Sequence, residues 1–224
     1  MNQPGHWKCP RTVSVVIDNA SWMLPYGEAL VAAIQKKGDH ATLCRSHDAI
    51  AEGTVAFFLG CVKITPPAIL ARNSYNIVVH ASDLPRGKGF SPLKWLLMEG
   101  TNTIPVCLFE AVEELDAGDV YYRTNLVLEG HELMNEIHPR LGELTQELCL
   151  RFLDEPTPPK GIPQSGTETR YPRRTLDDQR IDPHTPLAEQ FNTLRTVEND
   201  RFPAFFDLNG QRYRLRIEKW GSDS

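Results

Sequence analysis

A histidine follows directly after a short apolar run near the middle of the chain. Residues 77–79 are Ile-Val-Val, and a β-branched run of this kind is typical of a strand in a sheet covered on both faces. The next residue is His80, and the segment 83–89 that follows is rich in Pro and Gly turn signals. Because open α/β sheets bind ligands at the carboxyl ends of their strands, His80 is a candidate site residue.

A carboxylate, Asp116, is the second group that could take part in chemistry. It lies in the turn formed by residues 115–119, Leu-Asp-Ala-Gly-Asp. Such a turn is ordinary by itself, so a catalytic role for Asp116 depends on its pairing with His80. Together, an imidazole and a carboxylate can move a proton and hydrogen-bond a developing oxyanion.

The elements that must position these two groups form a mostly parallel sheet flanked by helices. Hydrophobic runs predict strands, and an apolar helical period bounded by Pro25 and Gly38 predicts a helix. The predicted strands span residues 12–17, 40–43, 54–59 and 77–79, and the predicted helix spans 25–37. This alternation of strands and helices predicts a Rossmann-like α/β fold.

The second half of the chain completes this domain and adds a smaller segment. A helix over 92–99, a strand over 103–110 and a long amphipathic helix over 130–152 are expected from the apolar pattern. Residues 154–168 contain several prolines and few apolar residues, which predicts an extended linker. We therefore expect a catalytic domain at 1–153 and a C-terminal segment at 169–224.

Two elements are expected within the C-terminal segment. Residues 186–196 can form a helix, and the alternating residues 203–220 form a β-hairpin that turns at Asn209-Gly210. One face of this hairpin is a possible homodimer interface. Of the neighbouring aromatic residues Phe205 and Phe206, strand alternation places one inward and one outward.

Composition limits the classes of partner and compartment. The formal net charge of the 224 residues is -5 and the pI is about 5.8, which disfavours a nucleic-acid partner. Five widely spaced cysteines match neither a zinc site nor a disulfide framework, so reduced thiols and a cytoplasmic location are expected. No apolar run approaches the length of a membrane span or a signal sequence, so no membrane association is expected.

The two candidate residues lie within motifs that resemble those of the formyltransferase family that uses 10-formyltetrahydrofolate. The first motif is His-Ala-Ser-Asp-Leu-Pro at residues 80–85, followed by Gly87, Gly89 and Pro92, and the second is the Asp-x-Gly of residues 116–118. The tail around residues 171–175, Tyr-Pro-Arg-Arg-Thr, is similar to that of sugar N-formyltransferases. The sequence around the first motif is most similar to that of the family branch that formylates a 4-amino sugar nucleotide in pseudaminic-acid biosynthesis, a route to cell-surface glycans.

The resemblance implies a role for each of the two residues. His80 corresponds to the histidine that polarises or protonates the tetrahedral intermediate, and Asp116 corresponds to the aspartate that orients it and accepts the amine proton. The co-substrate implied is 10-formyltetrahydrofolate. No metal is implied, since His80, Asp83 and Asp116 lack a third closely spaced ligand and amide transfer needs none.

Further residues are assigned to binding. By the resemblance, the folate pocket is lined from the loop after the third strand and from the Asp116 turn, and the residues assigned are Leu59, Gly60, Cys61, Ile64, Leu115 and Gly118. The alternative for the first loop is an ordinary strand-to-helix turn. The residues assigned to the acceptor substrate are Ser82, Lys88, Gly89, Arg195, Asn199 and Phe205. For the last three, the alternative is a small core beneath the hairpin.

One position departs from the family pattern. The family has an asparagine two residues before the histidine, and this chain has Val78 there. The loss of one oxyanion donor costs about a hundredfold or more in rate. Either another group such as Ser82, Lys63 or a backbone amide replaces it, or activity is weak.

The reaction expected is transfer of a formyl group from 10-formyltetrahydrofolate to the 4-amino group of a nucleotide-linked 4-amino-4,6-dideoxy sugar, with UDP as the preferred nucleotide. Four alternatives stay open. They are formylation of a dTDP-amino sugar, formylation of methionyl-tRNA, hydrolysis of the folate donor, and folate binding without catalysis.

Overall fold

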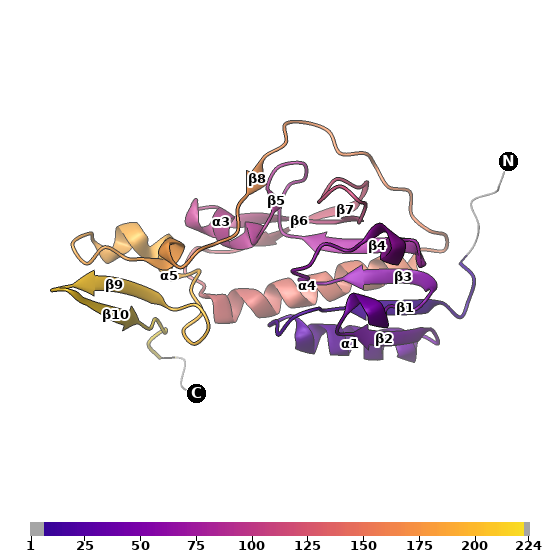
Figure 1. The fold of residues 1–224 in the computed structure, drawn as a ribbon, viewed down its shortest axis with the longest axis horizontal. Coiled ribbons are helices and arrows are strands. Elements are labelled where there is room, and N and C mark those ends of the chain that lie inside the picture. The colour runs from indigo at the N-terminus through magenta and orange to yellow at the C-terminus, as the bar shows by residue number, and fades with distance from the viewer. Residues whose placement is uncertain (1–6, 222–224) are drawn as a thin grey trace.

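A six-stranded mixed sheet forms the centre of the computed structural model, which describes residues 7–221 (Figure 1). Its order is β2-β1-β3-β4-β6-β7. The strands are β1 (Thr12–Val16), β2 (His40–Cys44), β3 (Gly53–Phe58), β4 (Asn73–His80), β6 (Thr103–Glu110) and β7 (Val120–Val127). The first four are mutually parallel, whereas β4 pairs with β6, and β6 with β7, in antiparallel fashion. The predicted α/β class with a mostly parallel sheet is confirmed.

Two long helices cover one face of the sheet. They are α1 (Leu24–Lys36) and α4 (Met134–Asp154), and apolar residues such as Leu30 and Phe152 lie in one core with inward residues of β1, β3 and β4. The short helix α2 (Pro67–Leu70) and the 3-10 turn η1 (His47–Ala49) lie near a second, smaller core that contains Val16 and Phe58. A further helix, α3 (Pro92–Met98), follows the loop after His80.

Residues 155–169, which we call the strap, cross the edge of the sheet after α4 (Figure 1). The strap contains no helix or strand, and it lies against β7 and the loop after His80. Ile162 exchanges two backbone hydrogen bonds with Val120 at the start of β7, at 2.8 and 2.9 Å. The strap then leads into β8 (Arg170–Tyr171), which pairs in parallel with β5 (Lys88–Gly89) in the loop after His80.

The C-terminal segment folds around its own small core. Ile181, Leu194, Val197 and Ala204 are buried together there. Its elements are η2 (Asp177–Gln179), η3 (Leu187–Gln190), α5 (Phe191–Leu194), β9 (Ala204–Leu208) and β10 (Gln211–Leu215). The predicted hairpin is confirmed.

The hairpin turn contains Asn209 at φ 51° and Gly210 at φ 75°. Positive φ at both central residues is what a type I′ hairpin turn requires. On β9, Phe205 is buried and Phe206 is partly exposed and stacked on Tyr213, in agreement with the expected alternation.

Two predicted elements differ in detail, and one strand was not predicted. The helix expected over 186–196 is a 3-10 turn followed by one short α-helical turn. The long helix begins at Met134 rather than Gly130, because Leu133 is its N-cap and the Glu136 carboxylate accepts the Leu133 backbone N–H. Strand β7 extends to Val127, well beyond the segment read as a turn.

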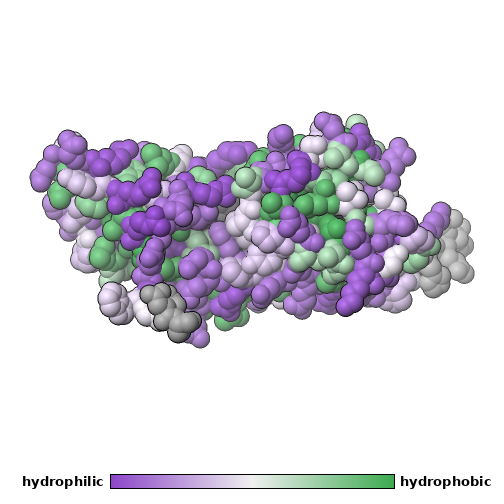
Figure 2. Space-filling model, turned by 90° about the horizontal axis from the view of Figure 1, so that it is seen from below, coloured by the Kyte–Doolittle hydropathy of each residue, from purple (hydrophilic) through white to green (hydrophobic). Residues whose placement is uncertain are grey.

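Hydrophilic residues cover most of the elongated surface, and apolar residues gather in smaller patches between them (Figure 2). Across residues 7–221, no helix combines the length and apolar character that a membrane crossing requires.

Candidate active site

His80 and Asp116 face each other at the carboxyl end of β4. His80 is the last residue of that strand, and its Nε2 lies 3.8 Å from Oδ2 of Asp116 and 3.0 Å from the carbonyl oxygen of Gly87. The two side chains are 10% and 9% exposed. Because a carbonyl oxygen can only accept, Nε2 of His80 carries a proton in this arrangement. The pairing predicted from the motifs therefore matches the geometry.

The Asp116 turn is tightly constrained. Asp116 has φ 53°, in the left-handed region, and its Oδ2 accepts the backbone N–H of Gly89 at 2.8 Å. Gly118 lies so close to β6 that a Cβ built on it would approach the carbonyl oxygen of Glu110 to 1.9 Å. Only glycine fits there, so Gly118 sets the path of the turn and is buried behind it.

A cleft of about 860 Å³, including its open mouth, lies in front of these two residues. Its lining is predominantly apolar. Val62 and Ile64 lie on the loop after β3, and their side chains are 46% and 67% exposed. The other apolar lining side chains are Phe58, Leu70, Val78, Val79, Phe90, Phe109, Val112 and Leu115. A flat, largely apolar ring system suits such a lining.

Four of the six residues assigned to folate line this cleft: Gly60, Cys61, Ile64 and Leu115. The other two do not. Leu59 is 1% exposed and points into the main core, because strand alternation turns it to the opposite face. Gly118 is packed against β6 as described.

Asp18, just after β1, holds the loop that forms one wall of the cleft. Its carboxylate accepts the backbone N–H groups of Val62 and Lys63 at 2.9 and 3.0 Å and the side-chain amide of Asn19. Burial alone would raise the pKa of Asp18, but these hydrogen bonds lower it below its usual value. Asp18 therefore stays ionised. On the same loop, burial raises the pKa of Cys61 to about 12, so this thiol is not a nucleophile near neutral pH.

A second groove, of about 910 Å³, adjoins the cleft and shares Val62 and Phe90 with it. Three cations line this groove: Lys94 on α3, and Arg173 and Arg174 after β8. Its remaining lining residues are Ser91, Thr175, Leu176, Gln179 and Phe202.

The cations of this groove lie beside aromatic rings. The Arg173 guanidinium stacks on Phe90 at 3.9 Å, and Lys94 lies 5.4 Å from the centre of the Phe202 ring. Burial lowers the pKa of Lys94, although Glu198 pairs with it at 2.6 Å. The Nε of Arg174 is buried without a hydrogen-bond partner. An anionic ligand with a flat ring would satisfy this combination.

The loop of residues 82–89 contains three of the residues assigned to the acceptor, and only one faces the cleft. Gly89 lines it and donates to Asp116. Ser82 is 1% exposed, and its Oγ is buried without a partner. Lys88 is 4% exposed, and its ammonium pairs with Glu168 of the strap at 2.7 Å. Ser82 and Lys88 therefore line neither the cleft nor the second groove, which corrects that assignment.

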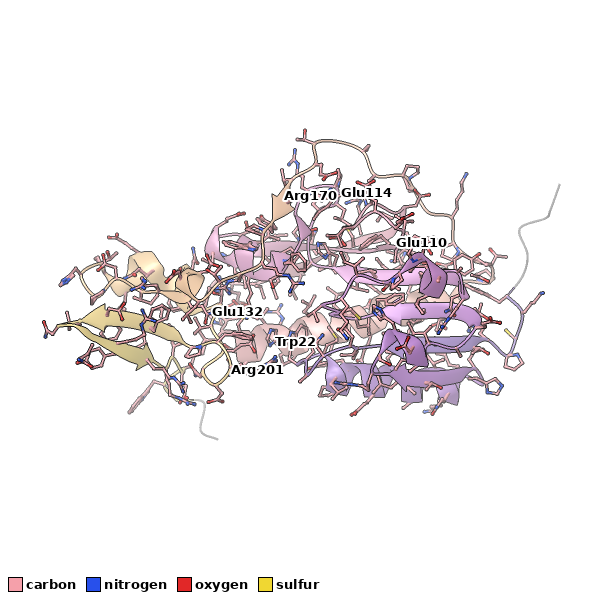
Figure 3. All side chains as sticks on the ribbon, viewed as in Figure 1. Trp22, Glu110, Glu114, Glu132, Arg170 and Arg201 are labelled. Carbon is pink, nitrogen blue, oxygen red and sulfur yellow. The ribbon has the colours of Figure 1, made fainter. Side chains whose placement is uncertain are left out.

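Charged residues beside the Asp116 turn and on β8 meet next to the site. Glu114 and Arg170 lie side by side there (Figure 3), with a guanidinium nitrogen 3.8 Å from the carboxylate. This contact joins the turn that contains Asp116 to β8.

The three assigned residues of the C-terminal segment are structural, which corrects the expectation for them. Arg195 is 1% exposed, and its guanidinium donates to the carbonyl oxygen of Glu132 and to the side-chain oxygen of Asn102. Asn199 exchanges two hydrogen bonds with the backbone of Ile217. Phe205 is 4% exposed in the hairpin. The small core beneath the hairpin, the alternative left open, accounts for them.

Within residues 7–221, no side-chain amide lines the cleft beside His80, where the family pattern has an asparagine. Val78 lines the cleft and packs between two apolar clusters. Asn76 is turned away, because its side chain donates to the carbonyl oxygen of Leu70. Of the suggested replacements, Lys63 lines the cleft and Ser82 does not.

The sequence marks Arg173 and Arg174 as either phosphate contacts or solvated charges, but local patterns did not reveal the strap contacts. The polar, basic stretch after residue 169 was the available signal for Arg173 and Arg174. Within residues 7–221, no group of three or more His, Cys, Asp or Glu side chains is arranged to hold a metal ion.

A formyl transferase family model matches residues 32–153, more than half of the chain. The chain belongs to the formyl transferase family. It is 27% identical to the methionyl-tRNA formyltransferase of Streptococcus equi over 168 residues, which are 74% of this chain and 53% of that protein. The chain thus spans about half the length of this relative.

Several solved structures of the family share the fold. A 4-N formyltransferase from Francisella tularensis has a TM-score of 0.72 at 15% identity, covering 96% of this chain and 98% of that one. A sugar N-formyltransferase from Shewanella has a TM-score of 0.65 at 14% identity, covering 92% of this chain and 96% of that one. The HypX protein of Aquifex aeolicus in complex with tetrahydrofolic acid has a TM-score of 0.70 at 15% identity, covering 91% of this chain and 37% of that one.

Proposed function

We propose that this formyltransferase transfers the formyl group of 10-formyltetrahydrofolate to the 4-amino group of a UDP-linked 4-amino-4,6-dideoxy sugar. The observation that carries the proposal is that two different pockets meet beside one His–Asp pair. The largely apolar cleft suits a pterin, and the adjoining groove with Arg173, Arg174 and Lys94 suits a nucleoside diphosphate. His80 and Asp116 line the cleft next to Phe90, which the two pockets share.

In this proposal the acceptor amine attacks the formyl carbon, forming a C–N bond, and the bond from that carbon to N10 of the folate then breaks. The proton lost by the amine goes to the Asp116 carboxylate, and N10 of the departing folate takes up a proton. His80 is the donor to the carbonyl oxygen as negative charge develops there, and its Nε2 proton turns to that oxygen from the Gly87 carbonyl that it binds in this structure. Closely held reactants supply much of the remaining rate enhancement.

The sugar acceptor is favoured over methionyl-tRNA by two observations. The formal net charge of the 224 residues is -5, which disfavours binding of a long polyanion. A compact groove with three cations suits one diphosphate better than an extended polyanion.

The test is a formyl-transfer assay with 10-formyltetrahydrofolate and UDP- and dTDP-linked 4-amino sugars, with methionyl-tRNA and a no-acceptor mixture beside them. We expect turnover with a UDP-sugar, and a fall in kcat of about a hundredfold or more in His80→Ala and in Asp116→Ala. His184→Ala, at an exposed position far along the chain, is the control and should retain full activity. Formylation of methionyl-tRNA alone, or release of formate alone, would contradict the proposal.

The groove is tested separately. Arg173→Ala should raise KM for the nucleotide sugar about tenfold while KM for the folate stays within about twofold, because its guanidinium lies in the groove. Arg214→Ala on the exposed side of the hairpin removes the same charge elsewhere and is the matched control. Equal effects of the two substitutions would leave only a general electrostatic contribution.

A further inference from the structure

The strap residue Gln164 contacts the Asp116 turn directly. Its Nε2 donates to the carbonyl oxygens of Asp116 and Gly118, each at 2.8 Å. Both hydrogens of this amide are therefore used on one turn. The contact joins residues that are 48 and 46 positions apart in the sequence.

The Asp116 turn needs such support. A non-glycine residue rarely adopts a positive φ, and Asp116 is at φ 53°. Asp116 and Gly118 belong to no strand or helix, and within residues 7–221 no backbone N–H donates to their carbonyl oxygens. The two bonds from Gln164 supply partners and fix the backbone from which the Asp116 carboxylate reaches Gly89 and His80.

The strap is seated so that Gln164 can reach the turn. Two residues earlier, Ile162 pairs with Val120 through two backbone hydrogen bonds. Gly161 passes so close to the chain that an added Cβ would lie 2.5 Å from Cβ of Asp119. These contacts set the register of the strap against the turn.

We propose that Gln164 is a positioning residue for Asp116, an inference that rests on the proposed formyl transfer. Its two hydrogen bonds hold Asp116 in the conformation that keeps the carboxylate within reach of the His80 ring and of the attacking amine. Gln164 itself does not line the cleft. It acts through the turn.

The first test follows the position of the Asp116 carboxylate and needs no turnover. The Gly89 backbone N–H donates to this carboxylate, so its signal in a ¹H–¹⁵N spectrum reports that bond. In Gln164→Met the Gly89 signal should move most of the way to its position in Asp116→Ala. Gln146→Met is the control, because the Gln146 amide also donates to a distant carbonyl, that of Tyr26. A Gly89 signal that Gln164→Met leaves unchanged would overturn the inference.

The second test separates positioning from a general loss of stability. Gln164→Met should lower kcat about ten- to a hundredfold with both KM values within about twofold, as expected for a misplaced catalytic group. In an Asp116→Asn background the same change should cost less than about threefold, because the group that Gln164 positions is already disabled. Multiplicative effects of the two substitutions would contradict the inference. A wild-type protein with an intact Gly89 signal and no formyl transfer would instead refute the proposed function alone.

Discussion

At the scale of single residues, Val78 stands where the family pattern has an asparagine, and this difference has the clearest chemical consequence. It lines the cleft two residues before His80, where a side-chain amide would reach a developing oxyanion. We predict that Val78→Asn raises kcat about tenfold, since a well-placed oxyanion donor contributes a hundredfold or more. The same change should lower the free energy of unfolding by about 1–2 kcal/mol because Val78 packs between apolar clusters.

Steady-state kinetics with the formyl acceptor and urea unfolding measure the two effects of Val78→Asn. Val79→Asn makes the same chemical change at the next position of the strand, where the side chain also lines the cleft but packs against the main core. An unchanged kcat in Val78→Asn would mean that another group already supplies the missing donor.

Glu110 provides a pH-dependent test of stability. Burial raises its pKa to about 7, although hydrogen bonds from the Asn76 backbone and the Tyr121 hydroxyl act in the opposite direction. The folded protein thus holds this proton more tightly than the unfolded chain, where the value is 4.5. The stabilisation is complete below pH 4.5 and is lost as the pH rises through about 7.

Glu110→Gln should remove this loss. Its free energy of unfolding, relative to that of the wild type, should increase by about 2 kcal/mol between pH 4.5 and pH 8, allowing for partial solvent screening. Urea unfolding across this range is the measurement, with Glu147→Gln at an exposed position of α4 as the control. A difference between wild type and Glu110→Gln that does not vary with pH would contradict the assignment.

At the scale of elements, the loop after β3 depends on a neighbouring strand for its shape. Asp18 binds the backbone of Val62 and Lys63 and so fixes the wall of the cleft. Asp18→Ala should weaken binding of tetrahydrofolate about tenfold with little change in kcat, because ordering the loop then costs part of the binding energy. Calorimetric titration measures this affinity. The exposed Asp48→Ala is the control, and equal affinities in both variants would show that the loop is stable without Asp18.

The elements recognised from sequence are those with strong local patterns. The strand over 54–59 can be predicted because burial on both faces restricts its residues to apolar types. The Asn209-Gly210 turn can be predicted because positive φ restricts the residue types there. Strand β7 was not predicted, because it is the last strand of the sheet and contains polar residues such as Arg123 and Asn125. Strands β5 and β8 have two residues each, too few for any periodicity.

The site was recognised from sequence only in part, for a related reason. His80 and Asp116 belong to local motifs, and the structure brings them together. The direction of a side chain depends on tertiary packing, so Leu59 and Arg195 were assigned to binding although both are buried. The support from Gln164 crosses 48 positions of sequence, a separation at which no local pattern operates.

At the scale of the whole molecule, Arg195 joins the C-terminal segment to the sheet domain. Its buried guanidinium binds Glu132, just before α4, and Asn102, just before β6. Figure 3 places Glu132 between the sheet domain and the hairpin. Removing one partner of a buried ion pair leaves the other charge uncompensated.

Arg195→Met should therefore lower the free energy of unfolding by about 3–5 kcal/mol. Thermal or urea unfolding checks this value. Arg214→Met, on the exposed side of β10, should change it by less than about 0.5 kcal/mol. Similar losses in both variants would mean that the buried contact contributes no more than a surface arginine.

The position of the strap in the sequence also determines when the His80–Asp116 site is completed during synthesis of the chain. Every strand of the central sheet lies before residue 128, whereas Gln164 and Thr169, which bind the two loops of the site, leave the ribosome later. Domains fold as units while the chain emerges, so the sheet can form before its catalytic loops are secured. Folding and the onset of activity are then separate events. A single protease cut in the exposed strap would silence the site while the sheet stays intact.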